Sequence, residues 1–431
     1  MSGTVPPAPT GWALRAYLAA TWLLTPLVPL LLRRRLARGK EDPARFGEKL
    51  GHASLPRPDG PLIWLHAVGI GEVMALRGLI GLLAGMLPGH HFLVTSTARA
   101  SAGVFARNVP ERTLHQFLPV DAPPCRRRFL DHWRPALAVW CEQDLWPGLV
   151  VETHRRGIPL ALVNARYDAA SVQGRERAGN LYRDLYRRFS LLAAQDETSA
   201  RFLEAMRPEA EILRHLSLKA SAPALSVDEA ALAAMRAATA GRRVWCLASS
   251  HAEDEAVALA AQALRLAADP GALLVIVPRV VARGGAIAAM ARQQGLRAAL
   301  RSAQPLPGPA DQVFVADTFG ELGLWFRLCP TVLMGGTFGP VEGHNPWEPA
   351  RLGAAVLHGP RVANFAADFA RLDAARAARE VGDAEAVAAA LGEDLSPLAE
   401  RARTLAESGA ADTERLARRL AALIGGRRGD V

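Results

Sequence analysis

Short apolar runs recur along the chain and alternate with longer segments that mix apolar and polar residues. In the first half, these runs occupy residues 62–65, 92–94, 137–140, 160–163 and 191–194. In the second half, they occupy residues 244–248, 273–277, 313–316 and 331–334. Runs of this length between helical segments are typical of buried strands in a parallel sheet. The pattern therefore predicts an α/β protein with two successive parallel sheets.

The length agrees with two domains, because 431 residues exceed what one hydrophobic core usually holds. We expect an N-terminal domain over residues 36–220 and a C-terminal domain over residues 221–431, with a linker that begins at residues 220–223. A weak alanine-rich helix is predicted over residues 230–240, and residues 384–423 are helical in composition. These terminal helices have the option of packing back on the N-terminal domain.

Residues 1–35 form a separate apolar segment that predicts a membrane anchor. Residues 16–32 carry no charge, and Arg33-Arg34-Arg35 follow at once. This run is near the lower limit of about 17–25 residues for spanning a bilayer. Its basic flank favours a cytoplasmic location for the domains that follow. Because Pro26 and Pro29 interrupt the run, a full span, a helix in the membrane interface and a buried core helix all remain open.

Composition narrows the choice of partners. The formal charge is +9, carried almost wholly by arginine, and the isoelectric point is about 10.1, which suits anionic partners such as membrane lipids or phosphorylated substrates. Nucleic acid is disfavoured, because the arginines are scattered and no recognised nucleic-acid motif occurs. The cysteines lie far apart without a C-x-x-C pair, which predicts reduced thiols and no zinc site: Cys125, Cys141, Cys246 and Cys329.

A glycine loop in the last third carries the strongest chemical signal. The predicted strand 331–334 ends at Gly335-Gly336-Thr337, and a helix is predicted over residues 347–352. Glycines allow a ligand to approach the backbone, and a helix N-terminus favours phosphate. Glu348, in the first turn, is placed to accept a hydrogen bond from a sugar hydroxyl. The combination suggests a nucleotide-sugar site, with an ordinary strand-to-helix turn as the alternative.

A second polar cluster follows the neighbouring predicted strand, 313–316. Asp317 or Thr318 is expected to cap the next helix, with Glu321 in its first turn completing an arrangement like a capping box. Because both clusters follow strands of one parallel sheet, both should lie at its carboxyl edge, where open α/β sheets bind ligands.

Together with these clusters, an ordered series of motifs resembles the 3-deoxy-D-manno-octulosonate (Kdo) transferases that glycosylate lipid A precursors. The series is Trp64 to Val73 with Gly69-Ile70-Gly71-Glu72, Leu118-Pro119-Val120-Asp121, Glu142-Gln143-Asp144-Leu145-Trp146-Pro147, Asn164-Ala165-Arg166 with Ser171, Leu216-Ser217-Leu218-Lys219, Ser250-His251 with Glu253-Asp254-Glu255, Pro278-Arg279, Gly359-Pro360 and Asn364-Phe365. The resemblance covers most of the chain. It implies the GT-B architecture, two Rossmann-like domains facing a cleft, with an inner-membrane anchor at the cytoplasmic face.

The resemblance also implies a reaction: inverting transfer of Kdo from CMP-Kdo to a lipid A precursor, lipid IVA, in lipopolysaccharide biosynthesis, without a metal or other cofactor. Glu72 matches the family's proposed general base, which takes the proton of the acceptor hydroxyl. Gly69 and Gly71 let the acceptor approach. The alternative for Glu72 is an N-terminal helix acid stabilised by the helix dipole.

The donor side is assigned in the same way. Arg279, after Pro278, is the candidate for holding the donor phosphate or carboxylate, since a guanidinium matches such anions. Arg166 and His251 are supporting candidates, with a structural ion pair or helix cap as their alternative. The remaining residues expected around the donor are Thr318, Gly320, Gly335, Gly336, Thr337, Asn345 and Glu348.

Two departures from the family pattern bear on the substrates. Gly69 stands where the family usually has serine, and Val280 stands where it has histidine. These changes leave two other hypotheses open beside the Kdo transferase. One is a diverged GT-B transferase with another sugar donor or acceptor, and the other is a membrane-bound scaffold without activity.

Overall fold

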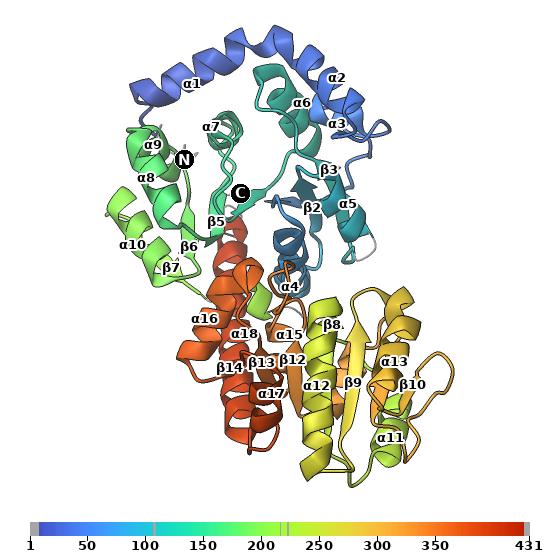
Figure 1. Cartoon of the computed structure of the whole chain (residues 1–431). Coiled ribbons are helices and arrows are strands. Elements are labelled where there is room, and N and C mark those ends of the chain that lie inside the picture. The colour runs from blue at the N-terminus through green and yellow to red at the C-terminus, as the bar shows by residue number, and fades with distance from the viewer. Residues whose placement is uncertain (1–7, 107–108, 216, 222–223, 426–431) are drawn as a thin grey trace. The chain divides into compact units, whose positions relative to one another are not determined.

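The computed structural model describes residues 8–106, 109–215, 217–221 and 224–425 (Figure 1). The chain divides into two compact units. The first unit consists of residues 1–221 and 409–431, and the second unit consists of residues 222–408. The last helix, α18 (Ser396–Gly425), begins in the second unit and ends in the first.

The first unit contains a sheet of seven parallel strands in the order β3-β2-β1-β4-β5-β6-β7. The strands are β1 (Leu62–His66), β2 (His91–Ser96), β3 (Thr113–Phe117), β4 (Leu137–Cys141), β5 (Leu160–Ala165), β6 (Leu191–Ala194) and β7 (Ile212–Arg214). All five apolar runs predicted in this half lie on strands. The pattern missed β3 and β7, which are the two edge strands.

Both faces of this sheet are buried, and alternate residues of each strand point to opposite faces. Trp64, Ala138 and Leu162 belong to one apolar cluster, while Leu65, Val139 and Val163 belong to the other. Helices cover both faces: α4 (Ile70–Met86), α5 (Arg99–Ala106), α6 (Pro123–Trp133), α7 (Pro147–Arg155), α8 (Ala169–Arg177), α9 (Leu181–Tyr186), α10 (Glu197–Met206) and the end of α18 (Figure 1). Residues of α4, α5 and α18 pack into the second cluster, and those of α6, α7, α9 and α10 into the first.

The N-terminal segment is two helices and not one continuous run. Helix α1 (Trp12–Leu23) is followed by a 3-10 turn (Thr25–Leu27) and by α2 (Val28–Ala37). The break falls at Pro26, where a proline removes a backbone donor. Among the described residues, no single helix has the length and apolar character needed to cross a membrane, but this pair, bent by 45°, meets that test when taken together.

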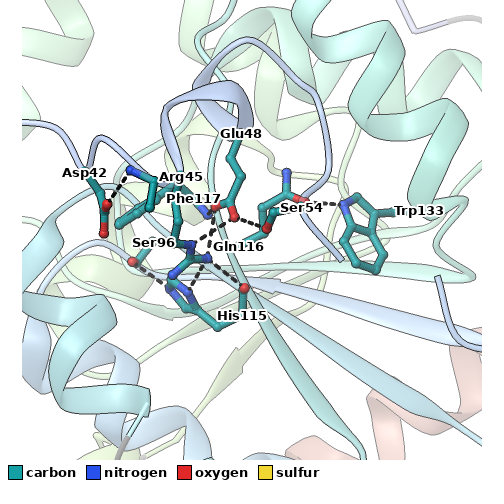
Figure 2. Close-up of polar contacts among 10 residues, drawn as sticks. Asp42, Arg45, Glu48, Ser54, Ser96, His115, Gln116, Phe117 and Trp133 are labelled. Atoms are coloured by element: carbon teal, nitrogen blue, oxygen red, sulfur yellow. Dashed lines mark hydrogen bonds and ion pairs between the residues drawn. The ribbon is translucent and has the colours of Figure 1, made fainter. Parts of the chain in front are cut away.

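An ion pair between partly buried Arg45 and buried Glu48 covers the free edge of strand β3 (Figure 2). Arg45 lies just before the short helix α3 (Phe46–Lys49) and contacts Glu48 through two nitrogens, each at 2.9 Å. Glu48 accepts the N–H of Phe117 at 2.7 Å, and Arg45 donates to the carbonyl of His115 at 2.9 Å. An edge strand leaves such backbone groups unpaired. The ion pair therefore replaces the contacts that a further strand would make.

The second unit contains another seven-stranded parallel sheet, in the order β10-β11-β9-β8-β12-β13-β14. Its strands are β8 (Val244–Ser250), β9 (Leu273–Pro278), β10 (Ala298–Leu300), β11 (Val313–Val315), β12 (Thr331–Met334), β13 (Ala355–His358) and β14 (Ala378–Glu380). The four predicted runs are β8, β9, β11 and β12. The prediction of two parallel-sheet α/β domains is confirmed.

Helices surround this sheet as well: α11 (Glu229–Ala238), α12 (Ala252–Ala268), α13 (Gly284–Gln293), α14 (Leu322–Leu328), α15 (Trp347–Arg351), α16 (Ala366–Ala374), α17 (Ala384–Ala390) and the start of α18 (Figure 1). The stretch predicted as helical over residues 384–423 is two helices, α17 and α18. The end of α18 packs in the first unit, where Leu416 and Leu420 are fully buried.

Each sheet has one position at which the direction of winding reverses. In the first unit, β2 follows β1 on one side while β4 lies on the other side. In the second unit, β8 has β9 on one side and β12 on the other. The loops after the carboxyl ends of such strand pairs form the usual ligand site of an open α/β sheet. The chemistry should therefore lie after β1 and β4, and after β8 and β12.

Candidate active site

Glu72 lies at the reversal point of the first unit. Strand β1 ends at His66, Gly69 is the residue before α4, and Glu72 is in the first turn of that helix. Its Oε2 accepts the N–H of Val68 at 2.9 Å. A Cβ on Gly69 would lie 3.1 Å from Oε1 of Glu72, so glycine leaves this carboxyl group room. Glu72 therefore occupies the helix-terminal position that was considered as its alternative role, and its catalytic role stays a prediction.

A second carboxyl group, Glu142, comes from the loop after β4. Its backbone has a positive φ of 65°, which is uncommon for a residue other than glycine. Asn164, which also has a positive φ of 55°, donates from Nδ2 to Oε1 of Glu142 at 3.3 Å. Asn164 in turn accepts the N–H of Leu218 at 3.0 Å and donates its own N–H to Nε2 of His215 at 3.2 Å. Such strained residues cluster at functional sites.

The two carboxyl groups interact directly. Burial, the nearby charge of Glu72 and a hydrogen bond with Glu72 together raise the pKa of Glu142 to about 7, against the opposing charges of Lys219 and Arg166. A hydrogen bond between two carboxyl groups requires a proton on one of them. The pair is therefore suited to accept and hold a proton at neutral pH.

Lys219 and Arg166 supply positive charge to this pair. A Cβ on Gly71 would lie 3.7 Å from Cε of Lys219, which places the lysine beside the first turn of α4, where Glu72 lies. The side chain of Arg166 is exposed. Glu142, Asn164 and Lys219 stood in the motif series without a role. Sequence alone does not show that β4 and β5 carry Glu142 and Asn164 toward Glu72, or that Lys219, in the 3-10 turn Leu218–Ser221, lies beside it.

At the reversal point of the second unit, the glycine loop is bonded to Asp254. The carboxylate of Asp254 accepts the N–H groups of Gly336 at 2.6 Å and of Thr337 and Phe338 at 3.1 Å each. The N–H of Gly335 donates to the carbonyl of Ala248 at 2.8 Å. These amides were expected to cradle phosphate. In this structure they are already satisfied within the protein, so a phosphate that used them would have to displace Asp254.

Several polar side chains next to this loop do lie together. Nε2 of His251 and Nε2 of His344 are 2.9 Å apart, with the two rings stacked. Burial and the charges of His251 and Arg279 lower the pKa of His344 to about 4. Because the Nε2 atoms face one another, one ring must donate and the other accept. His344 lies between the glycine loop and α15, and it had not been predicted as a site residue.

Asn345, Glu348 and Arg279 complete this cluster. Nδ2 of Asn345 donates to Oε1 of Glu348 at 3.3 Å. Burial raises the pKa of Glu348, while the Asn345 hydrogen bond and the charge of Arg279 act against that rise. Arg279 follows Pro278 at the end of β9, is exposed, and forms no ion pair with any residue that the structure describes. Its guanidinium thus has the capacity to bind an anionic ligand.

The cluster after β11 differs from its prediction. Helix α14 begins at Leu322, and neither Asp317 nor Thr318 caps it. Thr318 donates its hydroxyl to Glu321, which is paired with Arg301 at 2.8 Å, and Asp317 accepts the N–H of Ser302 at 2.9 Å. The predicted capping arrangement is therefore wrong, because Glu321 lies before the first turn and is paired elsewhere. Gly320 is exposed with a positive φ of 83°, and contact of Thr318 and Gly320 with a donor stays a prediction.

Within the described part of the chain, no group of three or more His, Cys, Asp or Glu side chains is arranged to hold a metal ion. The four cysteines are unpaired and buried. Burial raises the pKa of Cys141 and of Cys329 well above the usual value, which keeps these thiols protonated and unreactive.

Comparison with known proteins decides the family. Residues 44–221 match the family model described as 3-deoxy-D-manno-octulosonic-acid transferase (kdotransferase). A probable mitochondrial 3-deoxy-D-manno-octulosonic acid transferase of Arabidopsis thaliana is 34% identical over 359 residues, covering 81% of this chain and 80% of the relative. The 3-deoxy-D-manno-octulosonic acid transferase of Bordetella pertussis is 33% identical over 403 residues, covering 90% and 92%. This chain belongs to the 3-deoxy-D-manno-octulosonic acid transferase family.

As a Kdo transferase, the protein is a glycosyltransferase, and the hypothesis of a scaffold without activity is set aside. The fold has a solved counterpart. The UDP-GlcNAc 2-epimerase of Neisseria meningitidis, bound to UDP-GlcNAc, has a TM-score of 0.52 with 12% identity and covers 84% of this chain and 99% of that protein. At this identity the likeness concerns the fold alone, and it agrees with the two Rossmann-like units expected of the Kdo transferase.

Proposed function

We propose that this Kdo transferase moves Kdo from CMP-Kdo to the lipid A precursor lipid IVA, with inversion at the anomeric carbon. The observation that carries the proposal is the hydrogen-bonded pair Glu72 and Glu142 at the reversal point of the first unit, in a chain of this family. A sugar hydroxyl is a poor nucleophile until its proton is removed, and a buried carboxyl pair is suited to that task.

In the first unit, Glu72 is the general base. As the acceptor oxygen bonds to the anomeric carbon of Kdo, its proton passes to the Glu72 carboxylate. Glu142 tunes that carboxylate through their shared hydrogen bond, and Asn164 holds Glu142 through a contact of 3.3 Å. Lys219 and Arg166 limit the build-up of negative charge around the pair.

In the second unit, Arg279 binds the anionic groups of the donor. The bond from the anomeric carbon to the phosphate oxygen breaks as the new bond forms, so CMP leaves with its electron pair and a single displacement inverts the centre. Arg279 has no carboxylate partner among the described residues and stands near His344 and Glu348. A guanidinium at this place stabilises the leaving phosphate, so we propose a reaction that needs no metal ion.

Purified protein incubated with CMP-Kdo and lipid IVA tests this function. The wild type should release CMP in step with the formation of Kdo-lipid product. Glu72→Ala should lower the rate by about 100-fold or more, since general-base catalysis contributes roughly 10²–10⁴-fold, while CMP binding measured by calorimetry stays unchanged. The control is Glu197→Ala, which removes an exposed acid of α10. Absence of product with the wild type, or full activity of Glu72→Ala, would refute the assignment.

We further propose that α1 and α2 lie on the cytoplasmic face of a bacterial inner membrane and bind anionic lipids. The exposed side chains of this segment include seven large apolar ones: Trp12, Trp22, Leu23, Leu24, Leu27, Leu30 and Leu31. The start of the segment is bonded to a distant part of the first unit, because the N–H of Gly11 donates to buried Asp184 at 2.6 Å. At its end, Arg35 pairs with buried Glu41 in the loop that follows α2. This attachment favours a helix pair in the membrane plane, with Arg33, Arg34 and Arg38 facing lipid phosphates.

Co-sedimentation with vesicles tests the membrane proposal. Vesicles with anionic phosphatidylglycerol should bind the wild type, and Leu27→Glu with Leu31→Glu should abolish most of that binding. Leu264→Glu is the matched control, because Leu264 of α12 is 46% exposed while Leu27 and Leu31 are 49% and 52% exposed. Equal loss of binding in the control variant would show that general apolar exposure, and not this segment, governs attachment.

A further inference from the structure

Three successive acids, Glu253-Asp254-Glu255, lie in the first turn of α12. This turn follows His251, which belongs with His344, Asn345, Glu348 and Arg279 to the polar cluster described above, here called the donor cluster. Glu253 is exposed, whereas Asp254 and Glu255 are fully buried. Fully buried carboxylates are rare unless they are paired, because removing a charge from water is costly. Asp254 and Glu255 therefore need hydrogen-bond or ion-pair partners that offset the cost of burying their charges.

Asp254 receives four backbone N–H groups, two on each oxygen. Oδ2 accepts from His251 at 2.9 Å and from Gly336 at 2.6 Å, and Oδ1 accepts from Thr337 and Phe338 at 3.1 Å each. The bond to His251 is the local one that acids in a first helical turn often make. The other three donors lie more than 80 residues further along the chain, in the loop after β12.

The side chain of Glu255 holds a different loop. Its Oε1 accepts the hydroxyl of Ser250 at 3.0 Å, and Arg283 donates to its two oxygens at 2.5 Å and 3.3 Å. Arg283 ends the 3-10 turn Val281–Arg283, which follows Arg279 after strand β9. The N–H of Arg279 also donates to the carbonyl of Ser250 at 3.1 Å. Glu255 therefore contacts the residues on either side of Arg279 in space: Ser250 at the end of β8, and Arg283 in the turn after β9.

Stabilisation of α12 alone does not account for these contacts. A charge near a helix N-terminus interacts with the dipole whether or not it is buried, and Glu253 already supplies one in solvent. Asp254 and Glu255 instead direct their oxygens toward the ends of strands β12 and β9. Those strand ends carry the glycine loop and Arg279, so the contacts fix two separate parts of the donor cluster relative to His251.

We propose that Asp254 and Glu255 are positioning residues for the donor, an inference that rests on the proposed use of CMP-Kdo. Asp254 holds the loop Gly336 to Phe338, and its bond to the N–H of His251 sets that histidine opposite His344. Glu255 holds the segment that presents Arg279 to the anionic groups of the donor. Displacement of such groups by about 1 Å is enough to cost roughly 100-fold in rate.

Two isosteric substitutions in the full-length protein test this role. Asparagine at position 254 has one oxygen, so its NH2 group would face two N–H donors. Glutamine at position 255 removes the second oxygen that the Arg283 fork requires. We expect Asp254→Asn and Glu255→Gln each to raise the KM for CMP-Kdo by about tenfold or more, with the KM for lipid IVA changed less than about twofold.

Glu253→Gln is the matched control, because it removes the exposed acid of the same helical turn and should leave the KM for CMP-Kdo unchanged. Thermal melting of each variant identifies any loss of folding. If Asp254→Asn does not fold, Glu255→Gln decides the result. An unchanged KM for CMP-Kdo in a folded variant, or equal rises for both substrates, overturns the inference. Failure of the wild type to use CMP-Kdo would instead refute the proposed function.

Discussion

Glu142 and Glu72 share a hydrogen bond in the first unit, although 70 residues separate them in the sequence. The contact depends on strand order, since β1 and β4 are neighbours at the point where the sheet reverses its winding. Burial first, and then the charge of Glu72, raise the pKa of Glu142 to about 7. One carboxyl group of the pair is therefore protonated below neutral pH.

The pair predicts a pH dependence of activity. In the wild type, kcat/KM should rise through about pH 7, because Glu142 loses its proton there and the added negative charge favours removal of the proton from the acceptor hydroxyl. Glu142→Gln mimics the protonated form at every pH. Its profile should be flat between about pH 6 and 8 and should lie below that of the wild type at pH 8. A pH–rate profile of both proteins checks this, and an unchanged inflection in the variant would exclude Glu142 as its source.

The same pKa predicts a pH dependence of stability. A carboxyl group with a raised pKa binds its proton more tightly in the folded state, so its contribution is fully present below the unfolded pKa of about 4.5 and is lost as pH rises through about 7. Glu142→Gln should therefore stabilise the protein relative to the wild type at pH 8 by on the order of 1–3 kcal/mol, and much less at pH 5. Urea unfolding at both pH values measures the difference. A gain that is equal at pH 5 and pH 8 would contradict the assignment.

The ion pair of Arg45 and Glu48 at the edge of β3 predicts that substitution of Glu48 lowers the stability of the protein strongly. Glu48→Gln leaves the guanidinium of Arg45 without its two-oxygen partner and weakens the bond to the N–H of Phe117 (Figure 2). Because Glu48 is 1% exposed, we expect a cost of about 3 kcal/mol. Thermal melting should show the shift. Glu197→Gln is the control, since Glu197 is 55% exposed and such pairs contribute about 0–1 kcal/mol.

Close packing around the glycine loop predicts that alanine at Gly335 lowers stability, whereas alanine at an unpacked glycine does not. A Cβ at Gly335 would lie 2.4 Å from the carbonyl oxygen of Ser249 and 2.7 Å from that of Ala248. Gly335→Ala should therefore displace backbone at the end of β8 and lower stability by about 2 kcal/mol or more. Gly285→Ala is the matched control in α13, where the new Cβ would meet no atom within 4 Å. Alanine should raise stability there by about 0.5–1 kcal/mol, and a loss of equal size at both positions would contradict this account.

The strands that were predicted from sequence are buried, although the pattern also missed one buried inner strand, β13. Strands such as β4 and β12 have helices on both faces, so all residues of β4 and all but Thr331 of β12 are apolar, and the run is visible. The edge strand β3 places the polar residues His115 and Gln116 between Leu114 and Phe117, and the ion pair of Arg45 and Glu48 satisfies backbone groups on its open side. Its sequence therefore lacks a continuous apolar run, and the pattern missed it.

The predicted site residues were those with a local signature. Glu72 follows a strand and a glycine loop, and Arg279 follows Pro278 at the end of a predicted strand, so sequence placed both at a sheet edge. The partners of these residues have no such signature. Glu142 lies beside Glu72 because strands β1 and β4 pair. Asp254 accepts hydrogen bonds from the backbone N–H groups of Gly336 and Thr337, which the sequence had predicted to bind phosphate.

The order of apolar and polar residues by itself determined that the chain forms two α/β sheets, because burial of both faces of a parallel strand requires a continuous apolar run. The motif series determined the family. Only the tertiary structure decided which polar groups are partners. Long-range hydrogen bonds depend on strand order and on backbone conformations such as the positive φ of Glu142 and Asn164, and neither is encoded in any short stretch of sequence.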